Sequence, residues 1–172
     1  QELCANAGGG RSTLSNRFLG FMRAVLQRVS AAKVTANITH EASIGHGLVV
    51  LLGITQSDTI EDLDWLLNKI ISMRIFNDES AVMNKSVMDV GGQLLVVSQF
   101  TLYAQTKKGN RPSYIRADGH EIAVPLYEQF LQKAIQLMGK PVQSGIFGAD
   151  MQIDLTNDGP VTIIVDSKNK DL

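Results

Sequence analysis

The stretch GLVVLLGI, residues 47–54, constrains the fold more than any other part of the chain. It is a continuous apolar run of strand length, which is typical of a strand that is buried on both faces. The apolar period then changes to the 3-4-3 spacing of a helix, for which Asp58 or Thr59 can serve as the N-terminal cap. The apolar face of this expected helix consists of Ile60, Leu63, Leu66, Leu67 and Ile70. A buried strand that leads into an amphipathic helix predicts a mixed α/β fold.

Further strands are expected on both sides of this unit. Residues 23–30 are predicted to form a short strand, and residues 32–47 to supply one or two more around turn residues. A turn at Gly91-Gly92 is expected to lead into another buried strand. The C-terminal segments 151–156 and 159–166 both alternate apolar and polar residues, with a turn between them.

A second helix is expected over residues 125–138, with Pro125 in its first turn and Gly139 at its end. The chain has 172 residues, of which 44% are hydrophobic, and this suits one globular domain with a full core. No repeat or linker divides residues 22–172. We therefore expect a single mixed α/β domain of largely antiparallel sheets covered by two main helices.

The first 21 residues differ in character from the rest, being rich in glycine, serine and asparagine. We interpret residues 1–21 as an extension, most simply an expression-vector remnant, because they lack the long apolar run of a secretory signal. The only cysteine, Cys4, rules out an internal disulfide and a cysteine-based zinc cluster. This cysteine usage fits a reducing, cytoplasmic location.

The charge and hydropathy of the chain narrow the class of partner. No apolar run approaches the roughly 20 residues of a membrane span, so no membrane partner is expected. A formal net charge of -1 argues against wrapping a long nucleic-acid duplex, which needs many phosphate contacts. Contact with one short single-stranded end remains compatible with that charge.

Common catalytic motifs are missing from the sequence: it has no G-x-S-x-G elbow, no H-E-x-x-H and no Walker loop. His40, His46 and His120 are interpreted as surface or capping residues rather than metal ligands. The acidic cluster of residues 58–64 opens the first expected helix, where negative charge favours the helix dipole. No metal and no cofactor is expected.

The segment KKGNRPSYIR, residues 107–116, is the one concentrated basic region. Lys107, Lys108, Arg111 and Arg116 occur there beside Tyr114. One interpretation is a solvated loop. The other is a rim that contacts phosphates, with an aromatic side chain available for a base or sugar. The sequence leaves both interpretations open.

Two stretches carry the functional signal together, although neither does so alone. SQFTL at residues 98–102 places uncharged polar side chains at a strand end, and NDGPVT at residues 157–162 is by itself an ordinary turn. In combination they resemble the two signature motifs of the D-aminoacyl-tRNA deacylases of the D-tyrosyl-tRNA deacylase type. The resemblance covers residues 22–166 and includes LQRV, GLVVLLG, RIFND, GNRPSY and FGADMQ.

This resemblance implies hydrolysis of the ester that joins a D-amino acid, or glycine, to the 3′-terminal adenosine of tRNA. An aminoacyl ester is already activated, so the enzyme needs orientation and oxyanion donors more than a strong nucleophile. Backbone N–H groups at Phe100 and Thr101 are the expected donors, and Ser98 and Gln99 are expected to position the nucleotide. Thr101 is either a nucleophile or a positioning group; we favour positioning, with the 2′-hydroxyl of the adenosine assisting.

The second motif is implied to select the chirality of the substrate within a homodimer. In the family the bond between Gly159 and Pro160 is cis, and the pair reaches into the partner subunit's site to exclude L-amino acids. Asn157 belongs to the same motif. Arg28 matches an arginine near the Gly-Pro loop, with a surface ion pair as the competing interpretation. Residues that the resemblance assigns to the pocket lining are Gly148, Ala149 and Met151, although core packing accounts equally well for Met151.

Two other functions remain as alternatives. A nucleic-acid-binding module without hydrolytic activity would bind without cleaving the ester and would need a stronger basic face. A small-molecule esterase would act on simple esters without tRNA, but no self-contained triad is visible. The sequence does not rank the D-amino acids or tRNAs that are preferred.

Overall fold

A computed structural model describes residues 21–117 and 120–171. The expected extension, residues 1–21 with Cys4, therefore lies outside the described residues except for Phe21. No helix within the described ranges is both long enough and apolar enough to cross a membrane.

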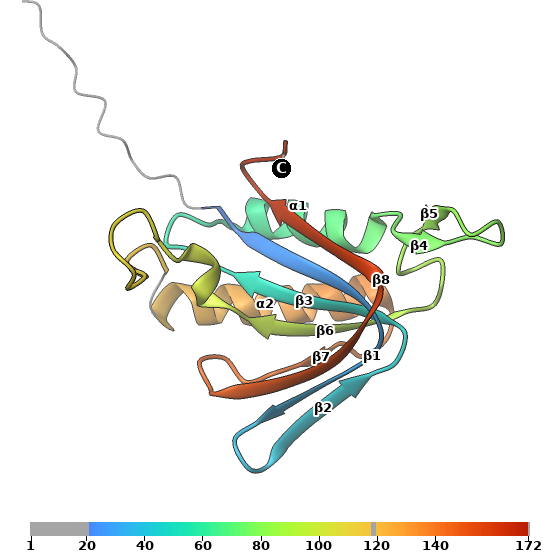
Figure 1. Cartoon of the computed structure of the whole chain (residues 1–172), viewed down its shortest axis with the longest axis horizontal. Coiled ribbons are helices and arrows are strands. Elements are labelled where there is room, and N and C mark those ends of the chain that lie inside the picture. The colour runs from blue at the N-terminus through green and yellow to red at the C-terminus, as the bar shows by residue number, and fades with distance from the viewer. Residues whose placement is uncertain (1–20, 118–119, 172) are drawn as a thin grey trace, which may run out of the picture.

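One curved sheet forms the centre of the molecule (Figure 1). Its strand order is β2-β1-β3-β6-β7, with β8 pairing along the other edge of β1. The pairs that β1 makes are antiparallel, whereas β3–β6 and β6–β7 are parallel. The strands are β1 (Arg23–Ala36), β2 (His40–Ile44), β3 (Gly47–Gly53), β6 (Gln93–Ser98), β7 (Gln143–Ser144) and β8 (Met151–Asp166). A short hairpin of β4 (Phe76–Asn77) and β5 (Met83–Lys85) forms a separate two-stranded sheet.

Two expected strand boundaries are wrong, because β1 and β8 run on where breaks were predicted. β1 continues to Ala36, and β8 passes through the expected turn at residues 157–160. The register between these strands shifts between Gln27 and Val29 and again between Val29 and Ala31. Such bulges reset the alternation of buried and exposed side chains, so that one long strand looks like two short ones in the sequence. Figure 1 shows the two strands bending together.

The first helix, α1 (Ile60–Ser72), is confirmed, and its cap is Thr59 rather than Asp58. The Thr59 hydroxyl accepts a hydrogen bond from the backbone N–H of Asp62, and the Asp62 carboxylate accepts one from the N–H of Thr59. This reciprocal pair is a capping box.

The second helix, α2 (His120–Met138), includes five residues before the predicted start, and Pro125 lies inside it. Its buried face already includes Ala123, so packing extends the helix upstream of the proline. The cost is limited, because a proline near a helix start removes only one intrahelical hydrogen bond. Gly139 ends the helix with a φ of 64°, as expected.

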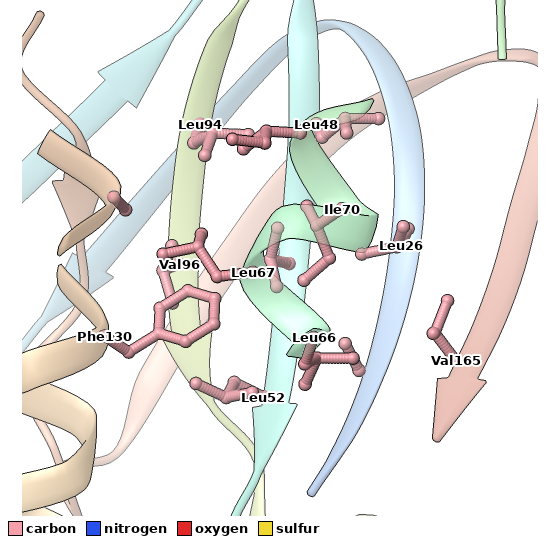
Figure 2. Packing of buried hydrophobic residues seen from close by; sticks show 14 of the residues in the cluster. Leu26, Leu48, Leu52, Leu66, Leu67, Ile70, Leu94, Val96, Phe130 and Val165 are labelled. Carbon is pink, nitrogen blue, oxygen red and sulfur yellow. The ribbon is translucent and has the colours of Figure 1, made fainter. Parts of the chain in front are cut away.

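The main core lies between the sheet and the two helices. Figure 2 shows leucines 26, 48, 52 and 94 of the sheet facing Leu66, Leu67 and Ile70 of α1, with Phe130 of α2 beside Val96. Burying one such side chain contributes roughly 1.5–3 kcal/mol. A second cluster, which includes Val34, Val49 and Val97, fills the inside of the curved sheet. The curvature brings β2 close to β7, where His40 Nε2 lies 2.8 Å from the carbonyl oxygen of Ser144.

Candidate active site

A cavity of about 480 Å³ opens at the end of β6, where the first signature stretch begins. Ser98, Gln99 and Phe100 all line it. The segment after β7 supplies the facing wall, and the first residues of β8 close it. The remaining lining residues are Leu52, Ile54, Val97, His120, Ala123, Phe147, Gly148, Ala149, Asp150, Met151 and Ile153. The structure therefore brings Ser98, Gln99 and Phe100 together with Gly148, Ala149 and Met151, as the sequence implied.

The strand ends here because the backbone leaves the sheet at Gln99. Its N–H still donates to the carbonyl of Leu52 at 2.8 Å, and this is the last ladder bond of β6. The next residues form the short 3-10 helix η1 (Phe100–Tyr103). Tyr103 packs under this turn, where its ring lies so close to Gly53 that a β-carbon there would be 2.8 Å from Cε2. The close approach of Gly53 and Tyr103 fixes the turn to β3.

The turn leaves two backbone donors without backbone acceptors among the described residues. The first hydrogen bond of η1 runs from the N–H of Leu102 to the carbonyl of Gln99. The N–H groups of Phe100 and Thr101 precede that bond, and a helix start always leaves such donors unpaired. Phe100 is 57% exposed. The site therefore offers two adjacent N–H groups beside an open cavity.

Thr101 is half-buried and does not line the cavity itself. Within the described chain its hydroxyl is hydrogen-bonded to the side-chain amide of Gln99. An amide is not a base in either orientation, so this partner cannot accept the threonine proton during an attack. Of the described residues that line the cavity, only His120 and Asp150 are ionisable.

Sequence reasoning missed the aromatic wall of the cavity. Phe147 meets the ring of His120 edge-on at 5.5 Å and the ring of Tyr127 at 5.5 Å. His120, which was interpreted as a surface or capping residue, thus lines the cavity from the first residue of α2. Burial raises the pKa of Tyr127, whose hydroxyl donates to the carbonyl of Val96 at 2.9 Å. No local pattern marks these residues, because they converge from separate elements.

The second signature stretch forms an outward loop of β8, not a turn between two strands. Val29 of β1 is opposite Asn157, and Gln27 is opposite Thr162, so that the four residues 158–161 of β8 stand opposite Arg28 alone. Asn157 Nδ2 donates to Gln27 Oε1 at 2.7 Å, and the Thr162 hydroxyl donates to the same oxygen at 3.3 Å. The asparagine and threonine of the motif therefore clamp the base of the loop. The Gly159-Pro160 peptide bond is cis.

The side chain of Arg28 packs against this loop and forms a hydrogen bond with it. It is only 6% exposed, and its Nε donates to the carbonyl of Asp158 at 3.1 Å. Nη1 donates to the carbonyl of Ile75 at 2.7 Å, which ties the loop to the segment before β4. The Asp158 carboxylate lies 3.3 Å from Nε and provides the counter-charge. The position expected for Arg28, near the Gly-Pro loop, agrees with this arrangement.

The two signature stretches do not meet within one chain. Gly159 and Pro160 are exposed and do not line the cavity. In the sheet, β3 and β1 stand between β6 and the C-terminal half of β8. Three strand spacings correspond to roughly 14 Å along the sheet.

The buried carboxyl group of Asp58, whose pKa is raised, is not among the residues that line the cavity. Asp58 is 7% exposed, and burial raises its pKa to about 6. Its Oδ2 accepts a hydrogen bond from the N–H of Thr55 at 2.6 Å, while Oδ1 has no hydrogen-bond partner among the described residues. The nearby Tyr103 also has a raised pKa because it is buried. We interpret this group as structural. The part of the chain that the structure describes contains no group of three or more potential metal ligands.

Comparisons with known proteins agree with the motif resemblance. The family model described as D-Tyr-tRNA(Tyr) deacylase matches residues 25–166. A "D-aminoacyl-tRNA deacylase" of Bacteroides thetaiotaomicron is 57% identical over 150 residues, covering 87% of this chain and 100% of the relative. The protein of the same name from Flavobacterium johnsoniae is 58% identical over 150 residues, with the same coverage of 87% and 100%.

Two solved structures share the fold. One, titled "c-Myc DNA Unwinding Element Binding Protein", has a TM-score of 0.78 and 42% sequence identity, covering 84% of this chain and 97% of that chain. The other is described as a probable eukaryotic D-amino acid tRNA deacylase, with a TM-score of 0.75 and 18% identity. It covers 86% of this chain and 100% of its own, and at that identity it supports the fold alone.

Proposed function

The chain belongs to the D-Tyr-tRNA(Tyr) deacylase family and is a hydrolase of D-aminoacyl-tRNA, and from this premise we propose how its parts divide the work. The cavity at the end of β6 receives the aminoacyl-adenosine end of the tRNA. The Gly159-Pro160 loop of a second copy selects the chirality of the amino acid. The observation that carries the proposal is the pair of unpaired N–H groups at Phe100 and Thr101, beside a cavity of about 480 Å³.

The reaction needs only water and well-placed donors. Water attacks the ester carbonyl carbon, and the carbonyl oxygen becomes an oxyanion that the N–H groups of Phe100 and Thr101 stabilise. One such donor is typically worth about 10²–10³ in kcat. The bond between the acyl carbon and the ribose 3′-oxygen then breaks, and the departing 3′-oxygen takes up the proton that the attacking water gives up. The free D-amino acid and the intact tRNA are the products.

Thr101 acts in this scheme as a positioning residue. Its hydrogen bond to the Gln99 amide supports this role, because the amide holds the hydroxyl without being able to accept its proton. The 2′-hydroxyl of the terminal adenosine lies next to the ester in the substrate itself. We assign the assistance of the attacking water to that group, since no side chain that can act as a base contacts Thr101 in the described chain.

The separation of the two signature stretches supports a homodimer. Gly159 and Pro160 are exposed on their own chain and lie away from its cavity. A two-fold arrangement lets each chain lend this loop to the other, because the contact is reciprocal. The rigid loop excludes an L side chain by collision, whereas glycine, having no side chain, is accepted. Glycyl-tRNA is therefore expected to be a substrate as well.

Matched aminoacyl-tRNAs test the proposal directly. At equal enzyme concentration, D-Tyr-tRNA and Gly-tRNA should be hydrolysed, and L-Tyr-tRNA should remain intact. The products are resolved by acid-gel electrophoresis of the labelled tRNA. Equal rates for the two tyrosyl enantiomers would contradict chiral selection. Binding of all three tRNAs without hydrolysis would instead favour the nucleic-acid-binding alternative.

A further inference from the structure

Within the described ranges, three basic side chains have no partner, and all three lie in one loop. Lys107, Lys108 and Arg111 make no hydrogen bond, ion pair or ring contact with any other residue of the described ranges. Every other lysine and arginine in those ranges does. Carboxylates pair with Arg23, Arg28, Lys33, Lys85, Lys133 and Lys168. Polar groups or Trp65 contact Arg74, Lys140, Lys69 and Lys170. Arg116 also has a partner.

The loop has a defined base and a fully exposed tip. Gln105 and Ser113 exchange two backbone hydrogen bonds, of 2.8 and 3.1 Å, and so close the loop. Gly109 lies between the basic residues with a φ of 72° and open space around it. Residues 106–111 are all exposed, and residues 105–117 include no acidic side chain. The positive charge is therefore concentrated on a loop whose base is fixed, and no carboxylate of the described residues pairs with these three side chains.

An aromatic contact joins this loop to the cavity. The ring of Tyr114 meets the ring of Phe100 edge-on, with centroids 5.2 Å apart and an interplanar angle of 72°. Phe100 lines the cavity and is one of the two residues that offer an unpaired N–H. Figure 1 shows the loop beside the short helix η1 that follows β6. A nucleic-acid strand whose 3′ end lies in the cavity would pass these basic residues as it leaves on this side.

We propose that Lys107, Lys108 and Arg111 form a phosphate rim that binds the backbone of the tRNA immediately upstream of its terminal adenosine. This inference rests on the proposed function, and it assigns the rim to the single-stranded end of the tRNA. The negative charge of the polymer complements the one region of the described chain whose cations have no partner, while the net charge of the whole chain is only -1. The rim recognises the backbone and not the base sequence.

The rim predicts a particular dependence on salt. Each phosphate that a protein neutralises on a single strand contributes about 0.7 to the slope of log affinity against log salt concentration. Loss of three contacts should therefore flatten the slope by about 2. The amino acid and the terminal adenosine bind in the cavity, so their contribution to the affinity should not change when the rim is removed.

The experiment compares a whole substrate with its end alone. The triple variant Lys107→Ala, Lys108→Ala, Arg111→Ala is assayed on D-Tyr-tRNA and on 3′-O-D-tyrosyl-adenosine. We expect the KM for D-Tyr-tRNA to rise tenfold or more with kcat nearly unchanged, and the salt slope to flatten. Hydrolysis of D-tyrosyl-adenosine should stay within twofold of wild type. The folding of the variant is checked by its thermal midpoint, which should not change because the three side chains have no partners.

A second triple variant, Lys33→Ala, Lys69→Ala, Lys170→Ala, removes the same charge elsewhere and should leave the KM for D-Tyr-tRNA near wild type. An equal rise in KM in this control, or an equal loss on both substrates, would overturn the proposal. A further contradictory result would be a rim variant whose KM for D-Tyr-tRNA is unchanged but which has lost a tight binding of single-stranded DNA that wild type shows. The rim would then be a DNA-binding surface. Wild type that cleaves neither substrate would contradict the proposed function itself.

Discussion

The guanidinium of Arg28 lies directly beneath Gly159: a β-carbon at position 159 would come within 3.0 Å of its Nη2. The same β-carbon would lie 2.8 Å from Cγ2 of Val161. Gly159 also has a φ of 128°, a conformation that residues with side chains rarely adopt. The loop is therefore held in shape by its own chain before any substrate arrives, and glycine is required there for folding as well as for access.

Gly159→Ala should consequently reduce stability, not only activity. Strain of this kind costs on the order of 1–3 kcal/mol, which corresponds to a fall of the thermal midpoint by roughly 2–12 °C in a chain of this size. Gly109→Ala is the matched control, because Gly109 has a φ of 72° but nothing within 4 Å. Thermal unfolding of both variants separates the collision from the backbone preference. Equal midpoints for the two variants would show that Arg28 and Val161 do not constrain the loop.

Thr101→Ala should slow deacylation of D-Tyr-tRNA by less than about tenfold, because loss of a positioning contact is milder than loss of a nucleophile. A D-tyrosyl substrate that ends in 2′-deoxyadenosine should be nearly inert with wild-type enzyme. Single-turnover rates on both substrates give the comparison. Thr101→Val keeps the size of the side chain and isolates the hydroxyl. Detection of an acyl group on Thr101 by mass spectrometry would contradict the positioning role.

Asp58→Asn should stabilise the protein at pH 8. Because the folded-state pKa of Asp58 is raised from 3.8 to about 6, the folded chain binds the proton more tightly than the unfolded chain. Stability therefore falls as pH rises from about 4 to about 6, and above that range the fold carries a buried charge. The variant removes a cost of about 1–3 kcal/mol at pH 8 and almost none at pH 4. Thermal midpoints at both pH values measure this, with the exposed Asp154→Asn as control; a gain of the same size at pH 4 would refute the assignment.

The local parts of the fold were predictable because the residues that determine them are adjacent in the sequence. The buried run at 47–54, the helical face from Ile60 to Ile70 and the cap at Thr59 all depend on such patterns. The continuity of β1 and β8 was not predictable, because it depends on a register shift opposite Arg28. Pairing between distant strands decides the length of each strand, and no local signal records it.

The candidate site shows the same division. Ser98, Gln99 and Phe100 were identified because they are consecutive and belong to a recognisable motif. His120 and Phe147 were missed because their neighbourhood arises only when α2 and the segment after β7 meet the end of β6. The absence of Gly159 and Pro160 from their own chain's cavity has no local signal either, and only the family resemblance implied it. That absence leads to the sharpest test of the assembly.

Mixing two inactive variants should restore activity if the site is shared between chains. Phe100→Pro removes one of the two backbone N–H donors and disables the strand-end site, and deletion of residues 159 and 160 disables the loop. In a mixed dimer, one of the two sites combines an intact strand end with an intact loop. Purification through a different tag on each variant isolates the mixed dimers, and with one working site of two, about half of wild-type activity should return. The measurement is the rate of D-Tyr-tRNA hydrolysis after the variants are co-expressed and purified through two different tags.

Each homodimer is the control and should show only its own residual rate. Activity no greater than the mean of the two homodimers would mean that the loop serves its own chain, and the shared site would have to be abandoned.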